Sequence, residues 1–170
     1  MSQTATLVPL EEYLRTSYKP ACDYIDGVLR QKAMPTKKHS RLQFRISKLV
    51  DRDWPYYEAL PELALRIRTG KFLVPDVAVM ERNAEGDPYP TTPVHLCVEI
   101  LSPDDRLSAL VAKCEEYHAW GVAFTWILDP LERRAFQYDA DHRLIEVAPD
   151  GVLRAGAIAI QCAEIFSALD

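Results

Sequence analysis

Two acidic side chains interrupt the most apolar segments of this 170-residue chain, and they restrict how it can fold. Asp76 stands inside the apolar run 72–79, and Glu99 ends the mostly apolar run 94–98. Runs of this length and composition are typical of buried strands. A buried carboxylate is costly unless it is paired or binds a cation. We therefore expect the two strands to pair, so that both acids converge at one end of a sheet.

The order of the predicted elements favours a mixed sheet flanked by helices, of the α/β or α+β class, with the strand before Ser102 at its centre. Ser102 and Pro103 suit the cap and first position of a helix that runs to about residue 120. The other predicted helices cover 10–16, 38–51 and 162–168, and the predicted strands cover 23–33 (with a turn at 26–27), 64–68, 72–80, 94–101, 122–128, 133–139 and 143–147. We expect residues 1–170 to form one domain.

Composition excludes several classes of protein. The chain is 48% hydrophobic, but no apolar run approaches the roughly 20 residues that cross a bilayer, so we expect no membrane segment. The four cysteines, at positions 22, 97, 114 and 162, are scattered and form no C-x-x-C pair. This pattern favours reduced thiols and a cytoplasmic protein.

A basic segment stands out against the net charge of −5, because positions 27–50 contain no acid. Within it, helical spacing places Arg41, Arg45 and Lys48 in one stripe. This stripe, with Lys38, is a candidate contact surface for phosphates, although a solvated helix face fits equally well. His39 opens the helix and is a candidate base or phosphate contact, although a histidine there is more often a surface group.

Asp76, Glu99 and Lys113 together suggest metal-dependent phosphate chemistry. Two carboxylates that converge without a cation repel each other, and Mg²⁺ accepts two protein carboxylates together with water and phosphate oxygens. Lys113 lies on the predicted helix after Glu99, where its ammonium group can reach the acids. The structural alternative makes Asp76 a turn residue, Glu99 a solvent-facing strand end and Lys113 a surface lysine.

A zinc site is a second alternative. His95, Cys97 and Glu99 alternate along one strand face, and Cys114 and His118 have the i, i+4 spacing of two helix ligands. No paired cysteine spacing supports this alternative.

The chain resembles the Uma-two family of "putative restriction endonucleases", in the PD-(D/E)XK nuclease superfamily. The resemblance covers nearly the whole chain. It rests on His39, on Lys113 with Tyr117, and on the segments DYIDG (23–27), VPDV (74–77), VEILSP (98–103), GV (121–122) and WILDP (126–130).

The resemblance implies a restriction-endonuclease-like fold in which Asp76 and Glu99 bind metal. Lys113 would then be the displaced motif lysine, because the usual position, two residues after the acid, holds Leu101. Asp23 stands where the family often has glutamate, and it either joins the metal site or lies at a strand start. Val28 and Ala109 replace acids that are common in the family.

These observations predict an endonuclease that depends on Mg²⁺ or Mn²⁺ and hydrolyses DNA phosphodiester bonds with a metal-activated water, without a covalent intermediate. Double-strand cleavage by a small domain with one site requires two copies, so we expect a homodimer. The alternative function is a catalytically inactive nuclease fold that binds nucleic acid or protein.

Overall fold

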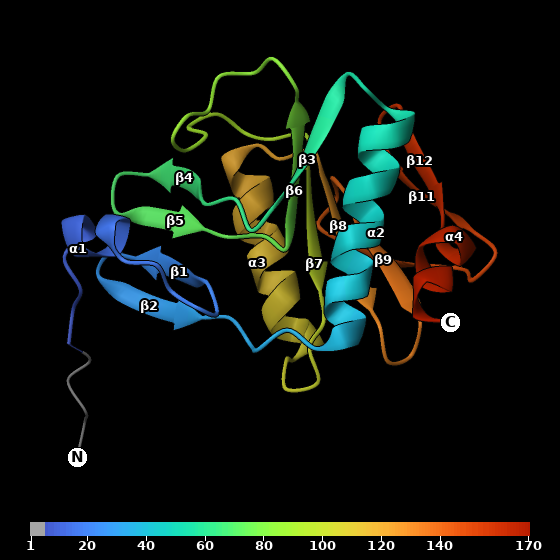
Figure 1. The fold of residues 1–170 in the computed structure, drawn as a ribbon, viewed down its shortest axis with the longest axis horizontal. Helices are drawn as coiled ribbons and strands as arrows, with labels where there is room; N and C mark the ends of the chain where they lie inside the picture. Colours follow the sequence, from blue (N-terminus) through green and yellow to red (C-terminus); the bar gives the residue numbers. More distant parts are fainter. Residues whose placement is uncertain (1–5) are drawn as a thin grey trace.

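The computed structural model describes residues 6–170. Its strands form two main sheets and a separate hairpin, and helices pack around them (Figure 1). The helices are α1 (Leu10–Arg15), α2 (Lys37–Asp53), α3 (Leu107–Trp120) and α4 (Cys162–Phe166), followed by the 3₁₀ turn η1 (Ser167–Leu169). The strands are β1 (Cys22–Ile25), β2 (Val28–Gln31), β3 (Tyr57–Pro61), β4 (Leu65–Arg68), β5 (Lys71–Leu73), β6 (Val77–Glu81), β7 (Leu96–Ile100), β8 (Phe124–Asp129), β9 (Arg134–Tyr138), β10 (Leu144–Val147), β11 (Val152–Ala155) and β12 (Ile158–Gln161).

The six-stranded sheet has the order β10-β9-β8-β7-β6-β3 and places the strand before Ser102 in its interior. Strands β7 and β8 are parallel and are joined through α3, whereas the other neighbouring pairs are antiparallel. A mixed central sheet with flanking helices was predicted from the sequence, and the structure confirms it.

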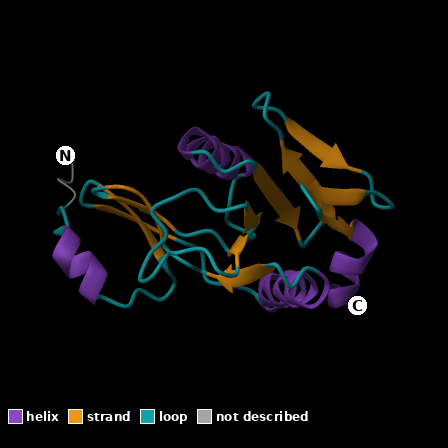
Figure 2. Cartoon of the chain, turned by 90° about the horizontal axis from the view of Figure 1, so that it is seen from above, coloured by secondary structure: helices purple, strands orange, loops and turns teal. Residues whose placement is uncertain are grey.

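Helices α2 and α3 cover opposite faces of this sheet, as the view from above shows (Figure 2). The apolar stripe of α2, with Leu42 and Ile46, packs against alternate residues of β6 and β7, such as Val77 and Val98. The β11-β12 hairpin and α4 extend the same layer. Intervening residues face α3 instead, which leaves Glu99 on the α3 side of the sheet.

The smaller sheet has the order β2-β1-β5-β4 and lies at one end of the molecule (Figure 1). The single strand predicted over 72–80 is wrong, because the chain leaves this sheet after β5 and enters the large sheet at β6. Between them, Val74 donates its backbone N–H to Asp23 Oδ1 at 2.7 Å. Pro75 has no N–H to offer a sheet ladder, so the strand breaks there.

Helix α3 begins at Leu107, later than predicted, and Ser102 is not its cap. Ser102 and Asp105 instead close a turn, in which the Ser102 N–H donates to Asp105 Oδ2 at 2.8 Å and the Asp105 N–H donates to the Ser102 carbonyl at 2.9 Å. Asp105 therefore stabilises the loop that precedes the helix. The helix ends at Gly121, whose φ of 118° lies in the left-handed region that glycine adopts without strain.

Strand β3 and the β11-β12 hairpin are absent from the predicted elements. Apart from β5 and β6, the remaining strands and the helices α1, α2 and α4 fall within a few residues of their predicted positions. Within residues 6–170, no helix combines the length and apolar character needed to cross a bilayer.

Candidate active site

The antiparallel register of β6 and β7 brings the two predicted acids together. Val77 pairs with Val98, so Asp76 and Glu99, one residue further along, stand opposite each other where the strands meet the small sheet. Both side chains are buried, with only 2% of each exposed. The convergence that strand alternation predicted is therefore present.

Both carboxylate oxygens of Asp76 have partners. Oδ2 accepts the backbone N–H of Ile100 at 2.6 Å, whereas Oδ1 lies 2.5 Å from Lys32 Nζ and 3.2 Å from His39 Nε2. Burial alone would raise the pKa of Asp76, but the charge of Lys32 and the contact with His39 outweigh it and lower the pKa below its usual range. Asp76 is held as a carboxylate.

Glu99 is held from the α3 side. The hydroxyl of Tyr117 donates to Glu99 Oε1 at 2.6 Å, and Lys113 Nζ lies 3.0 Å from the same oxygen. Burial raises the pKa of Glu99, and the nearby charges of Lys113 and Lys32 offset this only in part. Burial and the Glu99 charge also raise the pKa of Tyr117 well above its usual value. The tyrosine therefore remains a donor at neutral pH.

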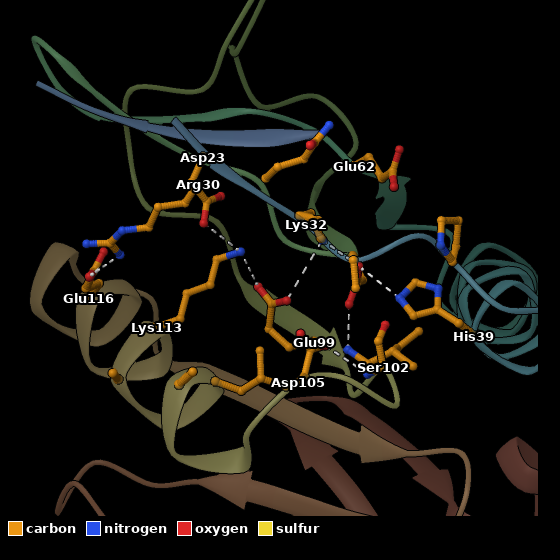
Figure 3. A pocket seen from close by; sticks show the side chains of 18 residues that line it. Asp23, Arg30, Lys32, His39, Glu62, Glu99, Ser102, Asp105, Lys113 and Glu116 are labelled. Atoms are coloured by element: carbon orange, nitrogen blue, oxygen red, sulfur yellow. Dashed lines mark hydrogen bonds and ion pairs between the residues drawn. The ribbon is translucent and has the colours of Figure 1, made fainter. Parts of the chain in front are cut away.

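Lys113 joins Glu99 to the small sheet. Its ammonium group lies 3.2 Å from Asp23 Oδ2 and donates to the Val74 carbonyl at 3.0 Å. Burial lowers the pKa of Lys113, but the charges of Glu99 and Asp23 raise it by more than burial lowers it, so the net shift of the pKa is upward. A charged lysine on the helix thus reaches the acid, as the spacing predicted. Figure 3 shows this chain of contacts from Asp23 through Lys113 to Glu99.

Lys32 is the site residue that sequence reasoning missed. It follows β2, and its ammonium group contacts Asp76 Oδ1, lies 4.0 Å from Glu99 Oε2 and donates to the Val74 carbonyl at 3.1 Å. The only sequence signal for Lys32 was its place in the acid-free segment 27–50. That segment was interpreted only as a basic stripe on the predicted helix, which does not include Lys32. The partner acid is 44 residues away, and no local pattern connects the two.

A cleft of about 220 Å³ opens onto these side chains, and Lys32, His39, Asp76, Glu99 and Lys113 are among the residues that line it. Arg30 and Glu116 also line the cleft, at its rim (Figure 3). Arg30 Nη1 lies 3.5 Å from Glu116 Oε1. Glu116 also pairs with Lys71 at 3.2 Å. A ligand that enters the cleft therefore meets both acids and both lysines.

Of the other predicted site residues, the structure places Asp23 and His39 in the cleft. The predicted phosphate contacts Lys38, Arg41, Arg45 and Lys48 lie outside the cleft lining on α2. Arg45 turns toward α4, where it donates to the Glu164 carbonyl at 3.3 Å. The other three side chains are exposed.

The residues of the zinc alternative have other partners. His95 Nε2 lies 2.9 Å from the Ala155 carbonyl oxygen, and the His118 ring packs edge-on against His142. Cys97 and Cys114 are buried free thiols. Within residues 6–170, no three His, Cys, Asp or Glu side chains are arranged around a common metal position. The structure does not assemble a zinc site from them.

The donor set fits a hard divalent ion that keeps much of its hydration. Asp76 Oδ1 and Glu99 Oε2 are carboxylate oxygens that face the same ammonium group, and Mg²⁺ or Mn²⁺ binds through one or two carboxylates plus water and phosphate oxygens. Asp23 stands apart from this pair, because Lys113 lies between it and Glu99.

Comparison with known proteins identifies the family. The model of the Uma2 family, described as "putative restriction endonuclease", matches residues 10–163. The chain belongs to this family. Among curated proteins, none matches.

One solved structure agrees with this family assignment. The crystal structure of a "putative nuclease belonging to DUF820" from Anabaena variabilis has a TM-score of 0.81 and 25% identity, over 96% of this chain and 99% of that one. The predicted restriction-endonuclease-like fold is thereby confirmed. A DrdV–DNA complex is much less similar, with a TM-score of only 0.37 and 13% identity over 63% of this chain and 12% of that one.

Proposed function

We propose that this Uma2-family protein is a DNA endonuclease that requires Mg²⁺ or Mn²⁺ and cleaves phosphodiester bonds with water. The observation that carries the proposal is the buried pair of carboxylates, Asp76 and Glu99, which open into a cleft and are bordered by two lysines. Membership of a family described as restriction endonucleases supports the reaction class.

Each residue of the site then has a role that its contacts support. A bound divalent ion would supply an activated water and neutralise charge on the phosphate. Asp76 and Glu99 would hold it, and His39 keeps Asp76 in place from helix α2. Tyr117 fixes the orientation of Glu99, and the charged Lys113 stabilises negative charge that develops near it. Asp23 orients Lys113 and is a further candidate metal ligand.

The substrate assignment to DNA rests on the family and on the basic segment. Lys38, Arg41 and Lys48 are exposed on α2 and remain candidate backbone contacts, together with Arg45. A homodimer would place two such clefts on opposite DNA strands. Four buried free cysteines are compatible with a reducing compartment such as the cytoplasm.

The decisive experiment is cleavage of supercoiled and linear DNA by the purified protein with Mg²⁺, Mn²⁺ or EDTA. Nicking that requires the metal is expected for the wild type and for Glu116→Gln, which alters an acid at the cleft rim. It should disappear in Glu99→Gln. Cleavage that survives in Glu99→Gln would overturn the site, and DNA binding without cleavage under any metal would favour the inactive nuclease fold.

A further inference from the structure

Only some oxygens of the two acids are available to a metal ion. Asp76 Oδ2 is held by the Ile100 N–H, and Glu99 Oε1 is held by Tyr117 and Lys113. The remaining oxygens are Asp76 Oδ1 and Glu99 Oε2. Among the described residues, Lys32 is the only side chain that pairs with both oxygens, at 2.5 Å from Asp76 Oδ1 and 4.0 Å from Glu99 Oε2. Figure 3 shows Lys32 beside Glu99.

The ammonium group of Lys32 therefore stands between the two oxygens that a divalent ion would bind. It offsets part of the negative charge of the two carboxylates, which would otherwise be costly in a buried setting. Since a metal ion and an ammonium group cannot share this position, binding of the ion requires Lys32 to leave Asp76.

Lys32 is the partner best able to leave. It lies in the connection between β2 and α2, which has no regular structure over 32–36, and 14% of its side chain is exposed. The Ile100 N–H is fixed by the strand, and the His39 side chain, which is 6% exposed, is held on α2. Lys32 also contacts the Val74 carbonyl, which offers its ammonium group a partner after it leaves Asp76.

Lys113 does not compete in the same way. Its ammonium group lies on the other side of Glu99, where its contacts are with Glu99 Oε1 at 3.0 Å and Asp23 Oδ2 at 3.2 Å, and it forms no ion pair with Asp76. The two lysines are therefore not equivalent, although both border the same acids.

We infer that Lys32 is an internal counter-ion that occupies the metal position in the metal-free protein and must be displaced when a divalent ion binds. This inference rests on the proposed function, because it takes the metal position from the same pair of acids. It adds that Lys32 sets the metal affinity and holds the buried acids together when no metal is bound.

The test measures Mn²⁺ binding by calorimetry and by the electron paramagnetic resonance signal of the free ion, with no DNA present. Lys32→Gln removes the charge and keeps a polar group near Asp76, and Lys32→Met removes both. Lys71→Met is the matched control, because Lys71 is also a partly buried lysine in an ion pair, and its partner Glu116 lines the cleft. Thermal unfolding with and without Mn²⁺ provides a second measurement.

We expect Lys32→Gln and Lys32→Met to bind Mn²⁺ roughly tenfold more tightly than the wild type, or better, because a charge that repels the ion is gone. Without metal, both variants should have a lower Tm than the wild type, since the acids lose their counter-ion. Adding Mn²⁺ should raise the Tm of each variant by more than it raises the Tm of the wild type. Lys71→Met should match the wild-type affinity. If Lys32→Met does not fold, Lys32→Gln decides the question.

The inference would be overturned if the Lys32 variants bind Mn²⁺ with the same affinity as the wild type or more weakly. It would also be overturned if neither the variants nor the wild type bind the ion. Tighter binding that vanishes in Lys32→Gln/Glu99→Gln would support it. The proposed function fails separately. Wild-type DNA cleavage that depends on Glu99 would uphold it even where Lys32 has no effect on affinity, and its absence would leave the affinity result intact.

Discussion

The hydrogen bond from Tyr117 to Glu99 offers a quantitative test of how the site is held. Tyr117 is fully buried and donates to a carboxylate at 2.6 Å. A hydrogen bond to a charged group contributes about 1.5–3 kcal/mol, against about 0.5–1.5 kcal/mol for a neutral one. Tyr117→Phe should therefore lower the free energy of unfolding of the metal-free protein by about 1.5–3 kcal/mol. For a chain of this size, this corresponds to a fall of about 3–12 °C in Tm.

Tyr13→Phe is the matched control, because the Tyr13 hydroxyl donates to the neutral backbone carbonyl of Cys22 at 2.9 Å. Its loss should be about 0.5–1.5 kcal/mol. The assay is urea unfolding at neutral pH in the presence of EDTA. In a Glu99→Gln background, Tyr117→Phe should cost only as much as the control. Equal losses for Tyr117→Phe and Tyr13→Phe in the wild-type background would refute the charge-assisted bond.

Two further predictions concern pH and the end of α3. Lys32 and His39 lower the pKa of Asp76 against the effect of burial, so its ionised form contributes stability above the unfolded-state pKa of about 3.9, and this contribution is lost as the pH falls through the folded-state pKa. Asp76→Asn should consequently lose stability less steeply than the wild type below about pH 4, and parallel curves of urea midpoint against pH would contradict this. Gly121→Ala should cost about 1–3 kcal/mol in the same unfolding assay, because Gly121 has φ 118° and a β-carbon would stand 2.8 Å from Pro93 Cγ. If Gly121→Ala is as stable as the wild type, the backbone at the C-terminal end of α3 accommodates a side chain without strain, and the prediction is wrong.

The acids of the site could be predicted from the sequence because their positions follow local rules. Asp76 and Glu99 interrupt apolar runs, and alternation along two paired strands leaves only one face for both. The reach of Lys113 follows in the same way from its position on the helix after the second strand. In each of these cases, the contact is decided by the spacing within one element or between two neighbouring ones.

The rest of the site depends on contacts between distant segments. The break at 74–76 moves the chain from one sheet to another, and the alternation of 72–80 does not reveal it. Lys32 reaches Asp76 from a sheet whose position relative to the acids is fixed only by tertiary packing. The prediction that Ser102 caps the helix was wrong for a local reason, because Asp105 accepts the Ser102 N–H and closes a turn before the helix begins.

The position of the lysine shows what such a site requires. Leu101, at the usual motif position, continues the sheet by donating its backbone N–H to the Leu128 carbonyl at 2.8 Å. Lys113 nevertheless brings its ammonium group to 3.0 Å from Glu99 from the facing helix, where Asp23 and the Val74 carbonyl fix it in place. The electrostatic requirement is a positive charge against one oxygen of Glu99, and it constrains where the ammonium group lies, not which backbone carries it. The acids cannot move in this way, because their positions follow from the register of β6 and β7. Within this fold, the register of β6 and β7 fixes the carboxylates, whereas a lysine can reach them from different parts of the chain, as Lys113 does from α3 and Lys32 does from the segment after β2.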